Sequence, residues 1–248
     1  MGKTVSVEAY VARRLSQDDV MAYENLYRLE HELMTRISLG LTPVNIRGVP
    51  PIGNPYYLEL MPPKLRNLRN QFSVFAALGA ERAIESGVDL RIAFVICGFY
   101  QRMAESASSP GEVDALAETM LEEFSRKVRE YQIPPNLSPC VREAMLYIRQ
   151  NIHRSLKIQN IAHRVGRSRS QLDRDFHGSL GMSPRDFLTQ EKFRNAEAFL
   201  LYTDMTITEI SQNTGFSSLS HFCTAFGRRN GMSPVKFRSV HSDAIRDI

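Results

Sequence analysis

The chain has 248 residues, of which 43% are hydrophobic and 23% charged, a composition that excludes a protein disordered over most of its length. Residues 138–248 hold 16 Lys and Arg against 10 Asp and Glu, a balance of +6, whereas residues 1–137 hold 15 against 17, a balance of −2. This asymmetry suggests a nucleic-acid-facing module beside a neutral one, although a mildly basic solvated surface explains the charge equally well.

No run approaches 18 uninterrupted apolar residues, and the start of the chain, MGKTVSVEAYVARRLSQDD, carries charges where a signal peptide needs an apolar core. We therefore expect a cytoplasmic protein without a membrane partner. Cys97, Cys140 and Cys223 are odd in number and lack ligand spacing, so reduced buried thiols are expected rather than disulfides or a zinc site. No catalytic, metal-ligating or cofactor-binding residues are identified, and no cofactor is predicted.

Residues 1–130 lack the alternating strands and Gly-rich turns of a β-barrel, and they read as helices. The segment 48–60, GVPPIGNPYYLEL, reads as loop or a short strand, and the proline-rich residues 131–138 read as a linker. The aromatic and Met residues of this region are interpreted as core more readily than as a pocket. The predicted helices cover 22–40, 62–87, 90–106 and 111–132.

The segments 158–187 and 207–237 align as two copies of one unit, each containing Gly-Met-Ser-Pro near its end. The offset between matched residues is 49 before the central turn and 50 after it, so the second turn carries one extra residue. Two copies are too few for a solenoid, and a tandem module is the better interpretation. The matched pairs are Ile161 with Ile210, Gly166 with Gly215, Leu172 with Phe222 and Phe176 with Phe226.

The pattern of residues 207–230 in the second unit predicts a helix, a tight turn and a second helix. Thr206 followed by Glu209 is a capping box that starts a helix. Gly215 suits the left-handed position after that helix, and Ser217 is expected to cap the next one. This order is the helix-turn-helix signature.

Gly166 and Ser168 play the same parts in the first unit, at 158–180. Each Gly-Met-Ser-Pro is then a corner, in which Gly181 or Gly231 ends a helix and Ser-Pro starts the next. Nothing in this motif needs to touch a ligand. The segment 183–203 between the units has apolar residues at helical spacing and is expected to fix one unit relative to the other, so that two recognition helices enter successive major grooves roughly 34 Å apart.

On the second helix of each unit, one stripe is apolar and the opposite face is a candidate surface for DNA. An Arg binds guanine in bidentate fashion, an Asp accepts from cytosine, and a Leu or Thr methyl meets the thymine methyl. A solvated helix face is the alternative, which an outward Leu and Cys fit poorly. The candidate base-reading residues are Arg169, Ser170, Asp173, Arg174, Leu219, Ser220, Cys223 and Thr224, and the candidate phosphate contacts are His177, Ser218, Arg228, Arg229 and Lys236.

Residues 138–240 resemble the DNA-binding domain of the AraC/XylS family of bacterial transcription regulators. The resemblance rests on SPCVREAMLYIRQNI, on the end of the connecting helix at Ala196 to Leu200, and above all on ITEISQNTGFSSLSHFCTAFGRRNGMSPVKFR. It implies an all-α, seven-helix double helix-turn-helix at 139–240, followed by a tail at 241–248. It also implies binding to double-stranded DNA and transcription control, most often activation through contact with RNA polymerase.

The same resemblance makes residues 1–130 a helical regulatory and dimerisation domain, not a cupin barrel, and implies a homodimer with an unknown effector. The run from Leu65 to Glu105 is similar to an all-helical N-terminal region of such regulators from Gram-positive bacteria. The sequence departs from the family at Thr224, where an Arg is usual, whereas Arg174 supplies the expected basic reader in the first unit.

Two other functions compete with sequence-specific transcription regulation. An enzyme, such as an alkyl transferase joined to this module, needs an activated cysteine, and Cys97 lies in the apolar run AFVICGFY without a neighbouring base. No catalytic motif appears elsewhere, so no enzyme is expected. A protein-interaction adaptor whose module does not bind DNA is the alternative that the missing Arg at Thr224 leaves open.

Overall fold

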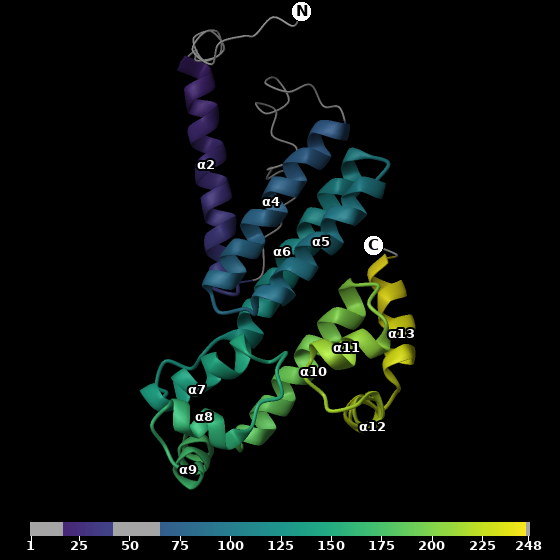
Figure 1. The fold of residues 1–248 in the computed structure, drawn as a ribbon. Coiled ribbons are helices and arrows are strands. Elements are labelled where there is room, and N and C mark those ends of the chain that lie inside the picture. Colours follow the sequence, from purple (N-terminus) through teal and green to yellow (C-terminus); the bar gives the residue numbers. More distant parts are fainter. Residues whose placement is uncertain (1–16, 42–64, 247–248) are drawn as a thin grey trace, which may run out of the picture. The chain divides into compact units, whose positions relative to one another are not determined.

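The computed structural model describes residues 17–41 and 65–246, and every regular element in them is a helix (Figure 1). The all-α prediction is therefore confirmed for this part of the chain. The helices of the N-terminal half are α2 (Gln17–Ser38), α4 (Leu65–Glu85), α5 (Leu90–Ser106) and α6 (Pro110–Tyr131).

These four helices match the four that the apolar periodicity predicts, with ends that shift by a few residues at most positions. The segment 48–60, predicted as loop or short strand, lies outside the described residues. The described residues fall into two compact units. The N-terminal unit comprises those up to Ser86 together with Tyr100–Glu130, and the C-terminal unit comprises Gly87–Phe99 together with the residues from Tyr131 onward.

The core of the N-terminal unit is built where α4 packs closely on α6. An added Cβ at Gly79 would lie 3.1 Å from the ring of Phe124, so the glycine lets the two helices approach. Phe72 and Met120 are fully buried in the same unit. The apolar residues of these helices are thus core, as the sequence analysis interprets them. The domain boundaries at 130 and 139 stay a prediction.

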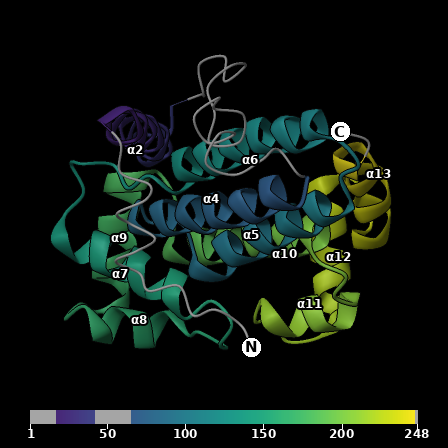
Figure 2. The same cartoon turned by 90° about the horizontal axis from the view of Figure 1, so that it is seen from above.

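Seven helices follow α6 in the described residues, in agreement with the predicted double helix-turn-helix. Helices α7–α9 and α11–α13 lie at opposite ends of α10 (Figure 2). Their bounds are α7 Pro139–Gln150, α8 Ile158–Arg164, α9 Arg169–Leu180, α10 Pro184–Tyr202, α11 Ile207–Asn213, α12 Leu219–Asn230 and α13 Pro234–Arg246.

Helix α10 contributes side chains to two cores, although Arg185, Asp186 and Thr189 near its start are exposed. Phe187 and Leu188 in its first half pack into the core of α7–α9. Phe193, Phe199 and Leu200 in its second half pack into the core that contains α11 and α12. Because apolar side chains of α10 are buried in both cores, each folded helix-turn-helix covers apolar surface of this helix.

Between these two cores, α10 carries a carboxylate with no exposed surface. Glu191 is 0% exposed, and its Oε1 accepts a hydrogen bond from a terminal nitrogen of Arg194 at 2.6 Å. Its Oε2 lies 3.4 Å from Nε of Arg149, which comes from α7. Both guanidinium groups also lie over the ring of Tyr131, at 4.7 Å for Arg149 and 5.5 Å for Arg194. Burial raises the pKa of Tyr131, which therefore stays neutral beside these charges.

Replacing Glu191 by Gln should destabilise the C-terminal unit by about 3 kcal/mol, because buried Arg149 and partly buried Arg194 lose their counter-charge. Urea denaturation followed by circular dichroism measures the change. The matched control is Glu143→Gln, whose carboxylate lies 3.9 Å from exposed Arg164 and whose loss should cost less than about 1 kcal/mol. Equal costs for the two substitutions would contradict the structural role given to Glu191.

Candidate nucleic-acid interface

The first helix-turn-helix consists of α8 and α9, joined by a turn at Gly166. Gly166 has φ +64°, in the left-handed region that glycine favours. Ser168 caps α9: its side chain accepts from the backbone N–H of Gln171, and the Gln171 side chain accepts from the Ser168 backbone. This reciprocal capping box confirms the predicted start of the recognition helix.

The second helix-turn-helix consists of α11 and α12. The predicted capping box of Thr206 and Glu209 is present, and it lowers the pKa of Glu209 through hydrogen bonds that the Thr206 backbone and hydroxyl donate to its carboxylate. Gly215 has φ +66° and occupies the predicted turn position. The two units therefore form the same local structure from different capping residues.

The predicted N-cap of α12 is wrong by one residue. The cap is Ser218, whose Oγ accepts from the His221 backbone N–H at 3.1 Å, while Ser217 Oγ lies 3.1 Å from the His221 ring nitrogen Nδ1. The extra residue of the second turn precedes the cap, so Ser218 is the position that corresponds to Ser168. Its hydroxyl hydrogen can still be donated to a phosphate oxygen, as the sequence analysis predicts for Ser218.

Both Gly-Met-Ser-Pro motifs are corners, as predicted. Gly181 and Gly231 each have φ +69° and end α9 and α12. Ser183 caps α10 by accepting from the Asp186 backbone N–H at 3.1 Å, and Ser233 accepts from the Lys236 backbone N–H at 3.3 Å. The two motifs thus place the next helix in the same way in both units.

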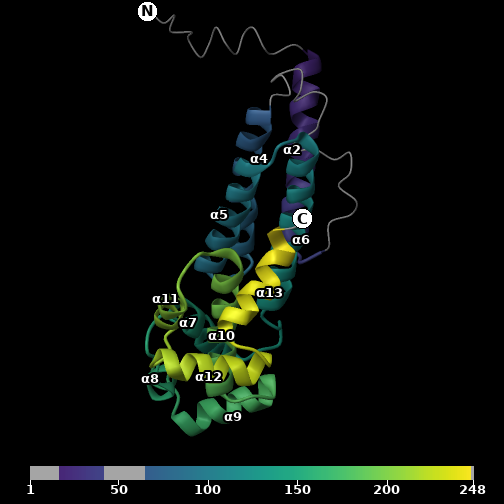
Figure 3. The ribbon, with the colours of Figure 1, turned by 90° about the vertical axis from the view of Figure 1, so that its right-hand side faces the viewer.

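The recognition helices α9 and α12 run nearly parallel on one side of the C-terminal unit. Both are seen end-on in Figure 1 and both run across the view in Figure 3. Leu172 and Phe176 of α9, like Phe222 and Phe226 of α12, are fully buried, which fixes the opposite faces outward. Both outward faces are therefore open on the same side of the C-terminal unit.

The candidate base-reading residues are exposed on these faces, with one exception. Cys223 is only partly exposed and packs against the second core, so its thiol lies at the edge of the core. Leu219 is 42% exposed, so its methyl groups are accessible to a partner. Arg169 and Arg174 are exposed and form no ion pair among the described residues. Ser170, Asp173, Ser220 and Thr224 are exposed as well.

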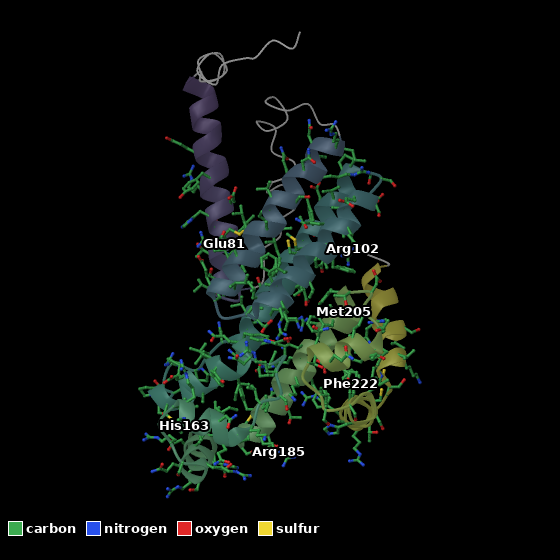
Figure 4. All side chains as sticks on the ribbon, in the orientation of Figure 1. Glu81, Arg102, His163, Arg185, Met205 and Phe222 are labelled. Atoms are coloured by element: carbon green, nitrogen blue, oxygen red, sulfur yellow. The ribbon has the colours of Figure 1, made fainter. Side chains whose placement is uncertain are left out.

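The candidate phosphate contacts are also exposed, but His177 and Arg229, like the N-cap Ser218, have internal partners. The Nδ1 atom of His177 lies 2.9 Å from the carbonyl oxygen of Asp173, one turn earlier on α9. The guanidinium of Arg229 lies 5.1 Å from the centre of the Phe193 ring. Arg228 and Lys236 are exposed without an ion pair in the described part of the chain. Figure 4 places Phe222 within the second helix-turn-helix and Arg185 at the start of α10.

A set of contacts at the second turn was not predicted. Lys192 of α10 donates a hydrogen bond to the carbonyl oxygen of Gly215, and burial lowers the pKa of this lysine. A Cβ added at Gly215 would lie 2.6 Å from the carbonyl oxygen of Ile152 and 2.8 Å from that of Arg154. The second turn therefore packs on the loop that follows α7. No local sequence signal distinguishes Gly215 from Gly166 in this respect.

No group of His, Cys, Asp and Glu side chains in the described residues is arranged to hold a metal ion. Cys97 is buried, and burial raises the pKa of its thiol, which disfavours the thiolate that a nucleophile needs. Of the described helices, none is long and apolar enough to cross a membrane.

Residues 161–239 match the family model described as a helix-turn-helix domain. The chain is 33% identical to the xylose operon regulatory protein of Escherichia coli K12 over 107 residues, 43% of this chain and 27% of that protein. It is 31% identical to the uncharacterized HTH-type transcriptional regulator YfiF of Bacillus subtilis over 121 residues, 49% of this chain and 38% of that protein.

Among solved structures, the chain is similar to the C-terminal domain of AraT, a response regulator from Geobacillus stearothermophilus. The identity is 33% and the TM-score 0.41, over 42% of this chain and 88% of that one. The chain spans 27% to 38% of the length of the curated relatives named above. Residues 161–239 thus match a helix-turn-helix domain, and the curated relatives named above are regulatory proteins, in agreement with the resemblance of residues 138–240 to the AraC/XylS family. The matched family is one of DNA-binding domains and not of enzymes.

Substituting Ala at Gly215 should destabilise the C-terminal unit more than the same change at Gly166. Both positions have the same positive φ, so Ala costs about 1–2 kcal/mol of backbone strain at each. Only at Gly215 does the new Cβ meet backbone carbonyl oxygens, which adds about 1–3 kcal/mol, whereas Gly166 has nothing within 4 Å. Urea midpoints of the two variants measure the difference, and equal midpoints would mean that the second turn does not pack as described.

Proposed function

We propose that the chain is a sequence-specific regulator of transcription that binds double-stranded DNA with α9 and α12 in two successive major grooves. The observation that carries the proposal is the parallel placement of the two recognition helices on one side of the unit, each with its apolar stripe buried and its polar face outward (Figures 1 and 3). The surplus of Lys and Arg in residues 138–248 supplies the attraction for phosphates.

In this proposal the two recognition helices contribute unequally to the discrimination between DNA sequences. Arg169, Asp173 and Arg174 of α9 offer directional hydrogen bonds to base edges. Leu219 and Thr224 of α12 offer mainly methyl contacts. The proposal therefore assigns most of the sequence discrimination to the first helix-turn-helix, and phosphate contact to Arg228 and Lys236 at the second.

Activation of transcription through RNA polymerase, assembly into a homodimer and control by an effector at residues 1–130 complete the proposal, and they rest on the resemblance alone. The proposed site of action is the bacterial cytoplasm, where the DNA lies. No enzymatic activity is part of the proposal, and the raised pKa of the Cys97 thiol favours this view over alkyl transfer.

The full chain should select a duplex sequence from random DNA, and its affinity should fall steeply with salt as counterions are released. Selection by the purified protein followed by electrophoretic mobility shift at about 50 and 200 mM salt measures both properties. A folded protein that enriches no sequence and binds no duplex at the lower salt concentration would refute the proposed function in favour of a protein-interaction adaptor.

Arg174→Ala should weaken binding to the selected duplex by about ten-fold or more, because a bidentate contact to guanine supplies roughly 1–3 kcal/mol. Its preference for the selected over a scrambled duplex should fall by the same factor. Arg228→Ala is the matched control: loss of a phosphate contact should weaken binding to both duplexes alike and reduce the salt slope by about one.

Leu219→Ala and Thr224→Ala test the converse assignment. Small effects of both on the preference for the selected duplex are expected, since each residue offers little more than a methyl contact. If instead they abolish the preference while Arg174→Ala leaves it intact, the second helix-turn-helix is the one that reads the sequence.

A further inference from the structure

Arg91 joins two helices of the double helix-turn-helix although it lies far before the matched domain, which begins at residue 161. One terminal nitrogen of its guanidinium donates to the side-chain oxygen of Asn195, on α10, at 3.2 Å. The other donates to the backbone carbonyl oxygen of Asn213, the last residue of α11, at 3.3 Å. The planar guanidinium fork thus bridges the connecting helix and the first helix of the second unit.

Asp89 holds this guanidinium in place. Its Oδ1 accepts from the backbone N–H of Arg91 at 2.9 Å and from Nε at 3.3 Å, and its Oδ2 accepts from a terminal nitrogen at 3.4 Å. The Asp89 side chain is only 6% exposed. Because the fork is already oriented, little side-chain entropy is lost when it bonds to α10 and α11.

The helix that begins here continues along the same part of the C-terminal unit. Val95 packs against the core that contains α11 and α12. The ring of Phe99 meets the ring of Tyr202, near the end of α10, edge to face at 5.4 Å between centres. Residues 89–99 are therefore built into the second helix-turn-helix.

The carbonyl that Arg91 binds is one that an isolated helix leaves without a partner. The last carbonyl groups of a helix lack intrahelical donors, and a cation there is favoured by the helix dipole. Lys192 satisfies the carbonyl of Gly215, two residues further on. Arg91 from α5 and Lys192 from α10 thus both hold the segment that leads into the recognition helix α12.

We propose that Arg91 is a positioning residue for DNA binding. By joining Asn195 to Asn213, it holds α11 against α10, and α12 follows because only a short turn separates it from α11. The distance and direction from α9 to α12 then match the two grooves before DNA arrives. The proposal rests on the function proposed above and adds that a residue outside the helix-turn-helix domain belongs to its DNA-binding machinery.

This role has a signature that a general loss of fold does not have. Arg91 acts only on the second helix-turn-helix, so binding through α9 alone does not depend on it. When the bridge is lost, α11 and α12 move more freely, and the effective concentration of α12 at its groove falls. Binding should therefore weaken only on a duplex that engages both recognition helices.

The test compares Arg91→Ala with the wild type in the full chain. The probes are the duplex selected by the wild-type protein and the same duplex with the half-site of the second helix-turn-helix scrambled. On the intact duplex, the variant should bind roughly ten-fold more weakly, the effect of one charge-assisted hydrogen bond. On the half-scrambled duplex, the two proteins should bind within about two-fold of each other, with equal salt slopes.

A second readout is the spacing between the half-sites. Two inserted base pairs turn the second half-site by about a fifth of a helical turn. The wild type should therefore lose most of the affinity that the second half-site contributes. Arg91→Ala should lose less, because its α12 is already poorly positioned. Arg91→Lys retains one donor group and should restore part of the affinity for the intact duplex.

Arg82→Ala is the matched control, because this partly exposed arginine forms an ion pair, within the described part of the chain, only with Glu85 on its own helix. This variant should bind both duplexes as the wild type does. Arg91→Gln replaces Arg91→Ala if the latter does not fold, with the same expected ratio between the duplexes. Unchanged binding to the intact duplex, or equal weakening on both duplexes, overturns the role of Arg91. A wild-type protein that selects no duplex refutes the proposed function itself, and the role of Arg91 with it.

Discussion

Helix α10 buries apolar side chains in two different cores, one along each half of the helix. Phe187 and Leu188 are core residues of the first helix-turn-helix, whereas Phe199 and Leu200 are core residues of the second. Removing either core would expose an apolar face of α10 to water, at roughly 25 cal/mol for each Å². The two units are thus thermodynamically linked, and the placement of both recognition helices depends on this one helix.

Polar contacts restrict how the two helix-turn-helix units are oriented about α10. Glu191 lies between the two cores and is shared by Arg149 from α7 and Arg194 from α10 itself. Lys192, the next residue, binds the turn of the second unit. Apolar packing tolerates small rotations, whereas buried charges and hydrogen bonds are satisfied in few geometries. These residues therefore fix the rotation of each unit about α10, which is what two-groove binding requires.

The exposed faces of α9 and α12 differ in chemistry although their backbones are alike. The same capping positions and the same left-handed glycines place both helices, so the difference lies in the side chains that each face offers. Arg174 can form directional hydrogen bonds with a base, and Leu219 cannot. The two helix-turn-helix units share one backbone structure but differ in the side chains of their outward faces. This difference permits one unit to specify the DNA sequence and the other to add affinity.

The helices, the corners and the two repeats could be predicted from the sequence, because they depend on contacts between residues close in the chain. Capping boxes such as Thr206 with Glu209 and glycines such as Gly181 are readable from spacing alone. The exposed positions of Arg169 and Arg174 followed from the apolar stripe of the same helix. The one-residue error at Ser217 arose because an insertion moves the cap without changing the residue type.

The distant residues that hold the two helix-turn-helix units together could not be identified before the folded structure was known. Arg91 and Asn213 are far apart in the sequence, and the acceptor is a backbone carbonyl, which every residue has. Gly215 and Gly166 occupy equivalent positions in the two sequence repeats, yet only Gly215 packs against the carbonyl oxygens of Ile152 and Arg154. Glu191 reads as an ordinary helix glutamate until Arg149 is brought over it by the packing of α7. Hydrogen bonds within a turn can be predicted from the local sequence pattern. The pairings named here form only after the chain has closed long loops, so no short-range sequence signal predicts them.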